Sequence, residues 1–317
     1  MTEPHSRTAL IGISCAIGGA VALSFNDLFI KQLSDDYALH QVILVRAFVG
    51  LAFIAGFMRL SGVNFASLRT TRPWAHLIRA AIVMVSNVCF FLGLAAMPIA
   101  DASAIGFVAP IFVTMISAVV LREKVGWHRW GAVLLGLVGV LIMLRPEGEF
   151  HWAAILILFS AACYATTQNM TRHLRETESS ITINFYTQIA FITVSVCMGF
   201  WVGDGHLSGS SDASLAFLFR PWILPPIGDW LYFVGTGVSV AAGGMLMGHA
   251  YRTNPPALIA PFEYTSMPLA VIYGLVFFGT FPDLRGWIGI ALIIGAGLYT
   301  LYRETLHGVR VTQDGGA

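Results

Sequence analysis

The chain has 317 residues, of which 56% are hydrophobic and 11% are charged, and its mean hydropathy is +0.74. A soluble chain of this length needs many more charged residues at its surface, so the composition excludes a soluble globular protein and predicts a membrane protein. The formal net charge of +1 says nothing about nucleic acid, but no basic patch with interleaved aromatic residues occurs outside the helix-flanking loops, so we expect no nucleic-acid partner.

Apolar runs follow one another along almost the whole chain. Each is long enough to cross a hydrocarbon core of about 30 Å, which takes roughly 20 residues of helix. Strands of a barrel alternate apolar and polar residues and cross in about ten residues, so they do not fit these continuous runs. The sequence predicts an all-α membrane protein with ten transmembrane helices at 9–33, 38–60, 74–98, 101–121, 128–144, 152–171, 181–202, 229–250, 257–279 and 285–302.

The basic residues predict the orientation. If the N-terminus is cytoplasmic, the inner loops and tails carry twelve Lys and Arg residues, whereas the outer loops carry only Arg145, Arg220 and Arg285. Basic residues concentrate on the cytoplasmic side of membrane proteins, so we expect a multi-pass protein of the cell inner membrane with both termini in the cytoplasm. The longest loop, 203–228, then lies outside, and we interpret it as a solvated connector rather than a lid.

The two halves of the chain repeat polar positions at a nearly constant offset. Asn26 precedes Gln168 by 142 residues, and Arg46 precedes Gln188 by the same number. Five crossings in each half make the second half enter the membrane from the opposite side, which gives an inverted repeat typical of secondary transporters. We expect a first repeat at 8–145, a second at 152–303 and a cytoplasmic tail at 304–317.

Several short motifs carry a resemblance to a known family. They are Asp101-Ala102-Ser103-Ala104, Ala109-Pro110, Arg122-Glu123-Lys124, Ala260-Pro261-Phe262-Glu263-Tyr264 and Phe281-Pro282-Asp283. In this order and spacing they resemble the drug/metabolite transporter superfamily, with two EamA-type repeats over almost all of the chain. The stretch from Asn26 to Lys31, together with Arg46, Thr71-Arg72-Pro73 and Phe262-Glu263-Tyr264, resembles most the bacterial S-adenosylmethionine and riboflavin carriers. The family often has a glutamate at the outer end of helix nine, where this chain has Thr280.

Charged residues inside the predicted helices require an explanation, because each costs at least ~2.5 kcal/mol at mid-membrane. Asp27 and Arg46 lie nearly equally far from the turn near residue 36, which predicts one depth for both. Two interpretations stay open: a salt bridge that holds two helices in register, or a substrate site where Asp27 binds a cation and Arg46 a carboxylate. Arg79 lies near the cytoplasmic end of its helix, and we interpret it as structural because its side chain can snorkel.

Uncharged polar side chains complete the predicted substrate site. Amides between helices serve either as packing contacts or as the lining of a cavity. Asn87 stands beside Phe90 and Phe91, whose rings could stack on a planar substrate. The predicted substrate-binding residues are therefore Asn26, Asp27, Arg46, Asn87, Gln168, Asn169, Gln188 and Tyr264, the last from the motif that carries the resemblance.

Prolines mark the ninth helix as a discontinuous element. Glu263 lies between Pro261 and Pro268, and each proline removes a backbone hydrogen bond and permits a kink. We predict Pro110, Pro261 and Pro268 as hinges. A partly desolvated carboxyl at Glu263 would hold a proton more readily than one in water, so we predict that it exchanges the proton that drives transport.

The expected function is secondary active transport of a small zwitterionic or heteroaromatic metabolite, such as an amino acid, S-adenosylmethionine or riboflavin, by alternating access. We expect no enzyme, no cofactor and no bound metal, since no zinc-ligand spacing, P-loop or nucleophile elbow occurs. The expected partners are the substrate and the lipid bilayer, with the protein a monomer or homodimer. The alternatives are an intramembrane enzyme or a channel or sensor without coupled transport.

Overall fold

The computed structural model describes residues 3–109, 112, 115–116, 127–144, 152–174, 177–253 and 262–314. Every regular element within these residues is helical, so the all-α prediction is confirmed for this part of the chain. The helices are α1 Glu3–Leu33, α2 Leu39–Leu60, α3 Pro73–Ala96, α4 Ile99–Gly106, α6 Trp127–Leu144, α7 Trp152–Leu174, α8 Ser180–Val202, α9 Ala213–Phe219, α10 Trp230–Thr253, α12 Ser266–Phe278 and α13 Leu284–Asp314, with 3₁₀ turns η1 Phe65–Leu68 and η2 Ile227–Asp229.

Five stretches in the described part of the chain are long and apolar enough to cross a membrane. They are Leu10–Leu33, Leu39–Leu60, Pro73–Ala96, Ile181–Val202 and Ile227–Ala250. Shorter apolar helices accompany them at Trp152–Thr167, Ser266–Phe278 and Leu284–Tyr299.

Local sequence signals explain where several helices begin and end. Pro73 occupies the first turn of α3, where its missing N–H costs nothing. The helix stops before Met97, whose backbone is extended because Pro98 follows it. Ser179 caps α8 by accepting a hydrogen bond from the Thr182 N–H at 3.1 Å. Gly279 ends α12 in the left-handed conformation, at φ 61°.

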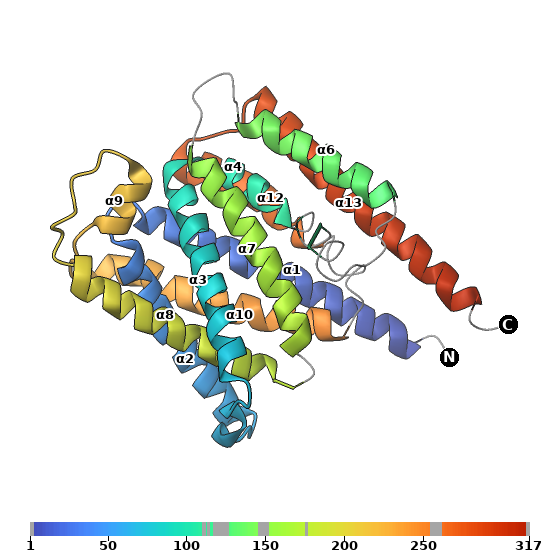
Figure 1. Ribbon diagram of the computed structural model, residues 1–317, viewed down its shortest axis with the longest axis horizontal. Coiled ribbons are helices and arrows are strands. Elements are labelled where there is room, and N and C mark those ends of the chain that lie inside the picture. Colours follow the sequence, from blue (N-terminus) through green and yellow to red (C-terminus); the bar gives the residue numbers. More distant parts are fainter. Residues whose placement is uncertain are drawn as a thin grey trace.

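Three helix pairs define the packing: α1 with α10, α3 with α7, and α6 with α13. Figure 1 shows α6 and α13 side by side along one edge of the bundle. Glycines allow two of these close approaches, since a Cβ on Gly19 would lie 3.2 Å from the Gly243 carbonyl oxygen, and one on Gly139 would lie 3.0 Å from that of Gly289. The largest apolar core among the described residues joins α1, α2, α3, α4, α7, α8, α9, α10 and α12.

The long connection between α8 and α10 is packed against the bundle. In α9, the side chains of Ser214 and Phe217 are fully buried, and the Ser214 hydroxyl donates a hydrogen bond to the Leu92 carbonyl oxygen at 2.7 Å. Arg220 donates from Nη1 to the Ser34 carbonyl oxygen at 2.8 Å. The interpretation as a solvated connector therefore holds for only part of the loop: Asp204 and His206 are exposed, whereas the short helix α9 buries Ser214 and Phe217 against the bundle.

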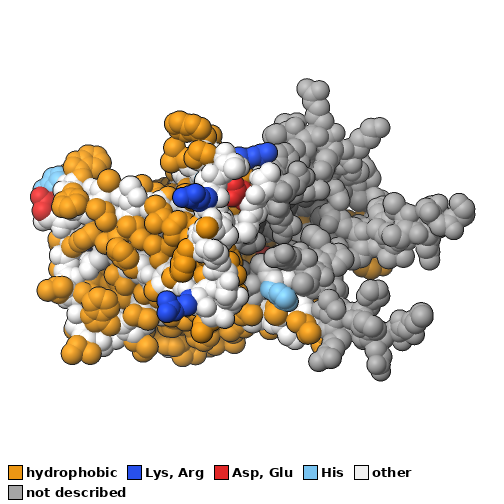
Figure 2. All heavy atoms as spheres, turned by 90° about the horizontal axis from the view of Figure 1, so that it is seen from below, with side chains coloured by type: hydrophobic (Ala, Val, Ile, Leu, Met, Phe, Trp, Pro, Cys, Tyr) orange, Lys and Arg blue, Asp and Glu red, His pale blue; other side chains and the backbone are white. Residues whose placement is uncertain are grey.

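The outer surface of the bundle is apolar. Figure 2 shows hydrophobic side chains over most of the described face, with charged side chains at only a few points. Leu60, Phe200 and Leu224 are each more than 90% exposed. An apolar surface of this extent fits contact with lipid. In the view of Figure 1, α1 begins and α13 ends on the right, whereas α9 lies on the left.

Candidate functional site

Arg46 is the centre of a buried polar cluster. It is 2% exposed on α2, and its Cζ lies 5.3 Å from the ring centroid of Phe91 on α3 and 5.0 Å from that of Phe191 on α8. Its Nη2 donates a hydrogen bond to Oδ1 of Asn87 at 3.2 Å, and Asn87 donates to the Val83 carbonyl oxygen at 3.0 Å. Two aromatic rings and one amide thus hold the planar guanidinium, while Nε is buried with no hydrogen-bond partner among the described residues.

Asp27 lies on α1 with an amide as its direct neighbour. Asn26 donates from Nδ2 to Oδ1 of Asp27 at 3.1 Å, and the Oδ1 atom of Asn26 is buried with no partner in the part of the chain that the structure describes. No ion pair among the described residues joins Asp27 to Arg46 within 4.0 Å, although the two charges are close enough to attract each other. Because a buried polar atom without a partner is costly, these open positions are where a bound ligand or water would lower the free energy most.

Gln188 joins the same contact between α2 and α8. A Cβ on Gly50 would lie 2.6 Å from Nε2 of Gln188, so the side chain rests directly on α2 one turn from Arg46. Its Oε1 is buried without a hydrogen-bond partner. The structure therefore brings Arg46 and Gln188, which the predicted repeat makes equivalent, to the contact between α2 and α8.

Several predicted residues lie outside what the structure describes. Gln168 and Asn169 belong to α7, but their side chains are outside the described residues, as are Pro110 and Pro261 altogether. Their assigned roles remain predictions.

Tyr264 occupies a second cluster. Its ring lies 5.1 Å from that of Phe107, beyond the end of α4, and its hydroxyl lies against Gly297 of α13. The hydroxyl has no hydrogen-bond partner among the described residues. Tyr264 thus lies at the contact of α4 and α13, and none of its described contacts is with the Arg46 cluster.

The helix around Pro268 is interrupted. Residues 262–263 are helical, 264–265 form a turn, and α12 begins at Ser266. Pro268 lacks the N–H that would bond to the carbonyl of Tyr264 in a continuous helix, which explains the position of the break. Glu263 is partly buried just before the turn, and its backbone oxygen accepts a hydrogen bond from Ser266 Oγ at 2.8 Å.

Two basic residues that sequence reasoning did not place in the site have specific partners. The Nζ atom of Lys31 donates to the carbonyl oxygens of Leu94 at 2.7 Å, Ala95 at 2.8 Å and Met97 at 3.1 Å, which caps the C-terminus of α3. Arg79 donates hydrogen bonds to side chains of α7 and α8. A basic residue within an apolar run was the available signal, but its partners come from distant parts of the sequence.

Polar contacts close both ends of the bundle. At the end near α9, the Tyr37 hydroxyl donates to the carboxylate of Asp229. At the opposite end, Thr70 donates to Oε1 of Glu178 at 2.6 Å, and Nε2 of His76 lies 3.6 Å from Oε2 of the same carboxylate. Tyr37 lies in the connection between α1 and α2, and Asp229 lies in η2 just before α10. Thr70 lies just before α3, and Glu178 lies just before α8.

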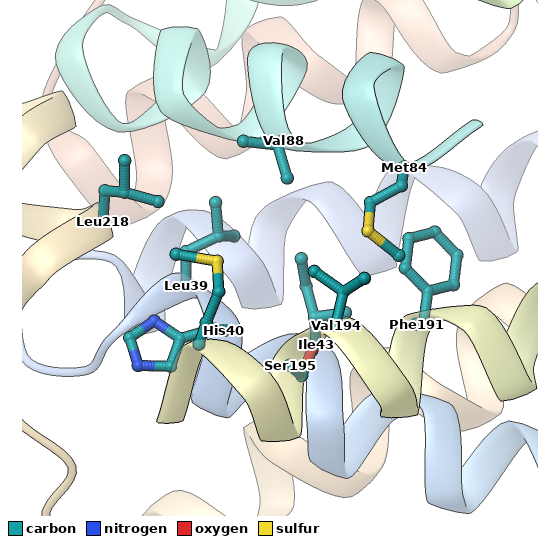
Figure 3. Close-up of a pocket in the computed structure, with 10 residues that line it drawn as sticks. Leu39, His40, Ile43, Met84, Val88, Phe191, Val194, Ser195 and Leu218 are labelled. Atoms are coloured by element: carbon teal, nitrogen blue, oxygen red, sulfur yellow. The ribbon is translucent and has the colours of Figure 1, made fainter. Parts of the chain in front are cut away.

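A small cavity of about 20 Å³ adjoins the Arg46 cluster between α2, α3, α8 and α9. This volume is about that of one water molecule. Figure 3 shows Met84 and Phe191 at one end and His40 at the other, with Ser195 on the α8 side. A second, open pocket of about 400 Å³ lies between α7 and residues 112, 115 and 116. Its lining is Phe112, Met115, Ile116, Phe159, Ala162, Cys163 and Thr166.

The sequence profile of the EamA-like transporter family matches residues 10–145 and 151–302. The chain belongs to the EamA-like transporter family. The two matched segments are consistent with a two-repeat architecture, and membership makes this chain a membrane transporter rather than an enzyme.

Curated relatives cover nearly the whole transporter. An S-adenosylmethionine uptake transporter of Rickettsia prowazekii is 25% identical over 94% of this chain and 95% of its own length. A riboflavin transporter of Rhizobium johnstonii is 27% identical over 93% and 92%, and one of Vibrio cholerae is 28% identical over 80% and 79%. A solved protein crystal structure shares the fold with a TM-score of 0.63 at 19% identity, over 95% of this chain and 99% of that one.

Proposed function

We propose that this transporter is a secondary active carrier of a small zwitterionic or heteroaromatic metabolite, such as an amino acid, S-adenosylmethionine or riboflavin, working by alternating access across the bacterial inner membrane. The observation that carries the proposal is the environment of Arg46, which is 2% exposed and has an unpartnered Nε where α2 and α3 meet α8. Burying a charged side chain in a membrane protein costs free energy, and a substrate that binds to Arg46 would offset this cost.

The proposed architecture is ten transmembrane helices in two inverted repeats, 8–145 and 152–303, with a cytoplasmic tail at 304–317 and both termini inside. The pattern of helix contacts supports it. The pair α1 with α10 is matched by α7 with α3, the pair α2 with α10 by α8 with α3, and the pair α1 with α12 by α7 with α4. Three further contacts, α2–α8, α4–α12 and α6–α13, each join equivalent helices, as expected for a two-fold axis in the membrane plane.

Within this architecture, Asp27 binds a cationic group of the substrate and Arg46 an anionic or electron-rich one. The amides of Asn26, Asn87 and Gln188 provide hydrogen bonds. The predicted positions Gln168, Asn169 and Tyr264 complete the lining. Glu263 exchanges the proton, and Pro110, Pro261 and Pro268 act as hinges during the change of access.

The experiment is a thermal-shift screen of the purified protein with amino acids, S-adenosylmethionine and riboflavin, followed by uptake into proteoliposomes. A ligand that binds only the folded protein stabilises it and so raises its melting temperature. At a ligand concentration of one hundred times the Kd, the free energy of unfolding rises by about 2.7 kcal/mol. We expect one compound class to raise the melting temperature and to show saturable uptake. Arg46→Gln should abolish both effects, whereas Arg59→Gln, at an exposed arginine of the same helix, should retain them. The absence of saturable uptake for every compound would contradict the proposal.

A further inference from the structure

Arg79 is oriented by two threonines. Its Nε donates to Oγ1 of Thr171 on α7 at 2.8 Å, and its Nη1 donates to Oγ1 of Thr187 on α8 at 2.9 Å. Each hydroxyl donates its own proton within its helix. Thr171 donates to the carbonyl oxygen of Thr167 at 2.7 Å, and Thr187 donates to that of Ile183 at 2.8 Å. The threonines therefore act only as acceptors toward Arg79, and they fix the direction of the guanidinium without neutralising its charge.

No carboxylate balances this charge in the described part of the chain. None of the ion pairs there includes Arg79 within 4.0 Å. Its titratable neighbour is the phenol of Tyr164, which is neutral near pH 7. A guanidinium has five N–H donors, and the two hydrogen bonds to threonine leave three of them without a partner among the described residues. Arg79 is partly buried, so a cation without a carboxylate partner among the described residues lies within an apolar helix, where charge is costly.

Arg79 and Arg46 contact the same side of α8. Arg79 bonds to Thr187, and Arg46 stacks on Phe191, four residues and about 6 Å further along the helix axis. On α3, Arg79 shares one face with Val83 and with Asn87, the hydrogen-bond partner of Arg46, because these residues are spaced by four. Arg79 and Arg46 thus lie one after the other along the interface between α3 and α8, and neither forms an ion pair with a described carboxylate.

We propose that Arg79 is a second substrate-binding residue, and that the transported metabolite carries a carboxylate which passes between Arg46 and Arg79 during the change of access. This inference rests on the proposed transport function. A carboxylate fits because the free end of one guanidinium presents two parallel N–H groups and balances one negative charge. A phosphate dianion would leave excess negative charge beside Asp27, so it fits less well.

The test compares pairs of compounds that differ by one carboxylate: S-adenosylmethionine with its decarboxylated form, and tryptophan with tryptamine. Binding to the full-length purified protein is measured for the wild type and Arg79→Gln. We expect the wild type to prefer the acid of at least one pair, and Arg79→Gln to weaken binding of that acid about tenfold to hundredfold, as for loss of a hydrogen bond to a charged group. The binding of the decarboxylated compound should not weaken.

Two controls separate binding from helix packing. Arg59→Gln removes the same charge at an exposed site of α2 and should leave the preference for the acid intact. Thr171→Val with Thr187→Val removes the acceptors but keeps the charge, so it should lower the melting temperature while the preference for the acid remains. If Arg79→Gln does not fold, the triple variant Arg79→Met/Thr171→Val/Thr187→Val removes the whole polar cluster without stranding a buried group, and it should lose the preference.

Equal weakening of acid and decarboxylated compound in Arg79→Gln would overturn the inference, because it would indicate a packing role. A wild type that binds neither acid, or binds both members of each pair equally, would overturn it as well. Saturable uptake of riboflavin alone, unaffected by Arg79→Gln, would remove the carboxylate inference and leave the transport function standing.

Discussion

Arg46 on α2 and Asn87 on α3 are joined by a hydrogen bond of 3.2 Å from Nη2 to Oδ1. An uncharged amide, and not the carboxylate of Asp27, is therefore the direct polar partner of this buried guanidinium. The charge of Arg46 stays available to a ligand, while its position is fixed by Asn87 and by the two phenylalanine rings.

The first prediction separates packing from substrate binding at Asp27 and Arg46. Arg46→Gln removes a hydrogen-bonded buried group and should lower the free energy of unfolding by about 1–3 kcal/mol and abolish transport. Asp27→Asn should abolish transport with a smaller loss of stability, since no ion pair joins the two residues. Melting temperature and proteoliposome uptake measure the two effects. Recovery of both properties in the double mutant would indicate a structural pair instead.

Lys31 should stabilise the end of α3. Lys31→Met removes three hydrogen bonds to the carbonyl oxygens of Leu94, Ala95 and Met97, and the free energy of unfolding should fall by about 1–3 kcal/mol. Lys31→Arg should restore part of the loss. The control is Arg69→Met, at an exposed residue beside η1, and a loss of the same size there would show that the effect is not specific to this cap.

The contact of Tyr37 with Asp229 should weaken only at alkaline pH. Burial and the neighbouring Asp229 carboxylate raise the pKa of Tyr37 from 10.0 to about 12. The folded protein holds the phenolic proton more tightly than the unfolded chain, so this stabilisation is complete below about pH 10 and is lost as pH rises to about 12. Melting temperatures between these values should therefore fall more steeply in the wild type than in Tyr37→Phe.

A hydroxyl of α10 provides the matched comparison for Tyr37. The Tyr232 side chain has a ring contact with Phe29 but no hydrogen bond among the described residues. Tyr232→Phe should therefore retain the wild-type alkaline profile. Identical profiles for Tyr37→Phe and the wild type would show that the contact with Asp229 contributes nothing to stability.

Glu263 should couple proton movement to transport. Glu263→Gln keeps the shape but fixes the group neutral, so substrate binding and exchange of substrate for substrate should survive, while accumulation driven by a pH difference is lost. Proteoliposomes with an imposed pH gradient measure this. Asp204→Asn, at an exposed carboxyl in the long connection, should keep gradient-driven uptake. Continued accumulation by Glu263→Gln would reassign its carboxyl to helix packing or substrate contact.

The orientation is testable with reporters that are active only in the cytoplasm. A reporter after Ala317 or within Thr70–Pro73 should be active, and one near Ser210 should be silent, because basic residues flank the first two positions. The reverse pattern would mean that the protein has the opposite topology, with both termini outside the cytoplasm.

Hydropathy located several membrane helices well, but it missed the polar ends of the first and last helices. The run predicted at 38–60 is α2 at Leu39–Leu60, and the run at 74–98 is α3 at Pro73–Ala96. The last helix, however, continues from the predicted end at 302 to Asp314, and the first begins at Glu3 instead of 9. The apolar pattern reports the part of a helix that lipid surrounds, and polar turns at its ends carry no such signal.

The sequence by itself determined the helical class, the family resemblance and the buried charges, because apolar runs and ionisable residues within them are local properties. Only the tertiary structure decided the partners of those charges. Lys31 caps a helix 63 residues away, and Arg79 reaches threonines 92 and 108 residues away. Such contacts depend on the rotation and depth of each helix in the bundle. The small residues at the helix interfaces determine both, and the sequence of one helix alone does not encode them.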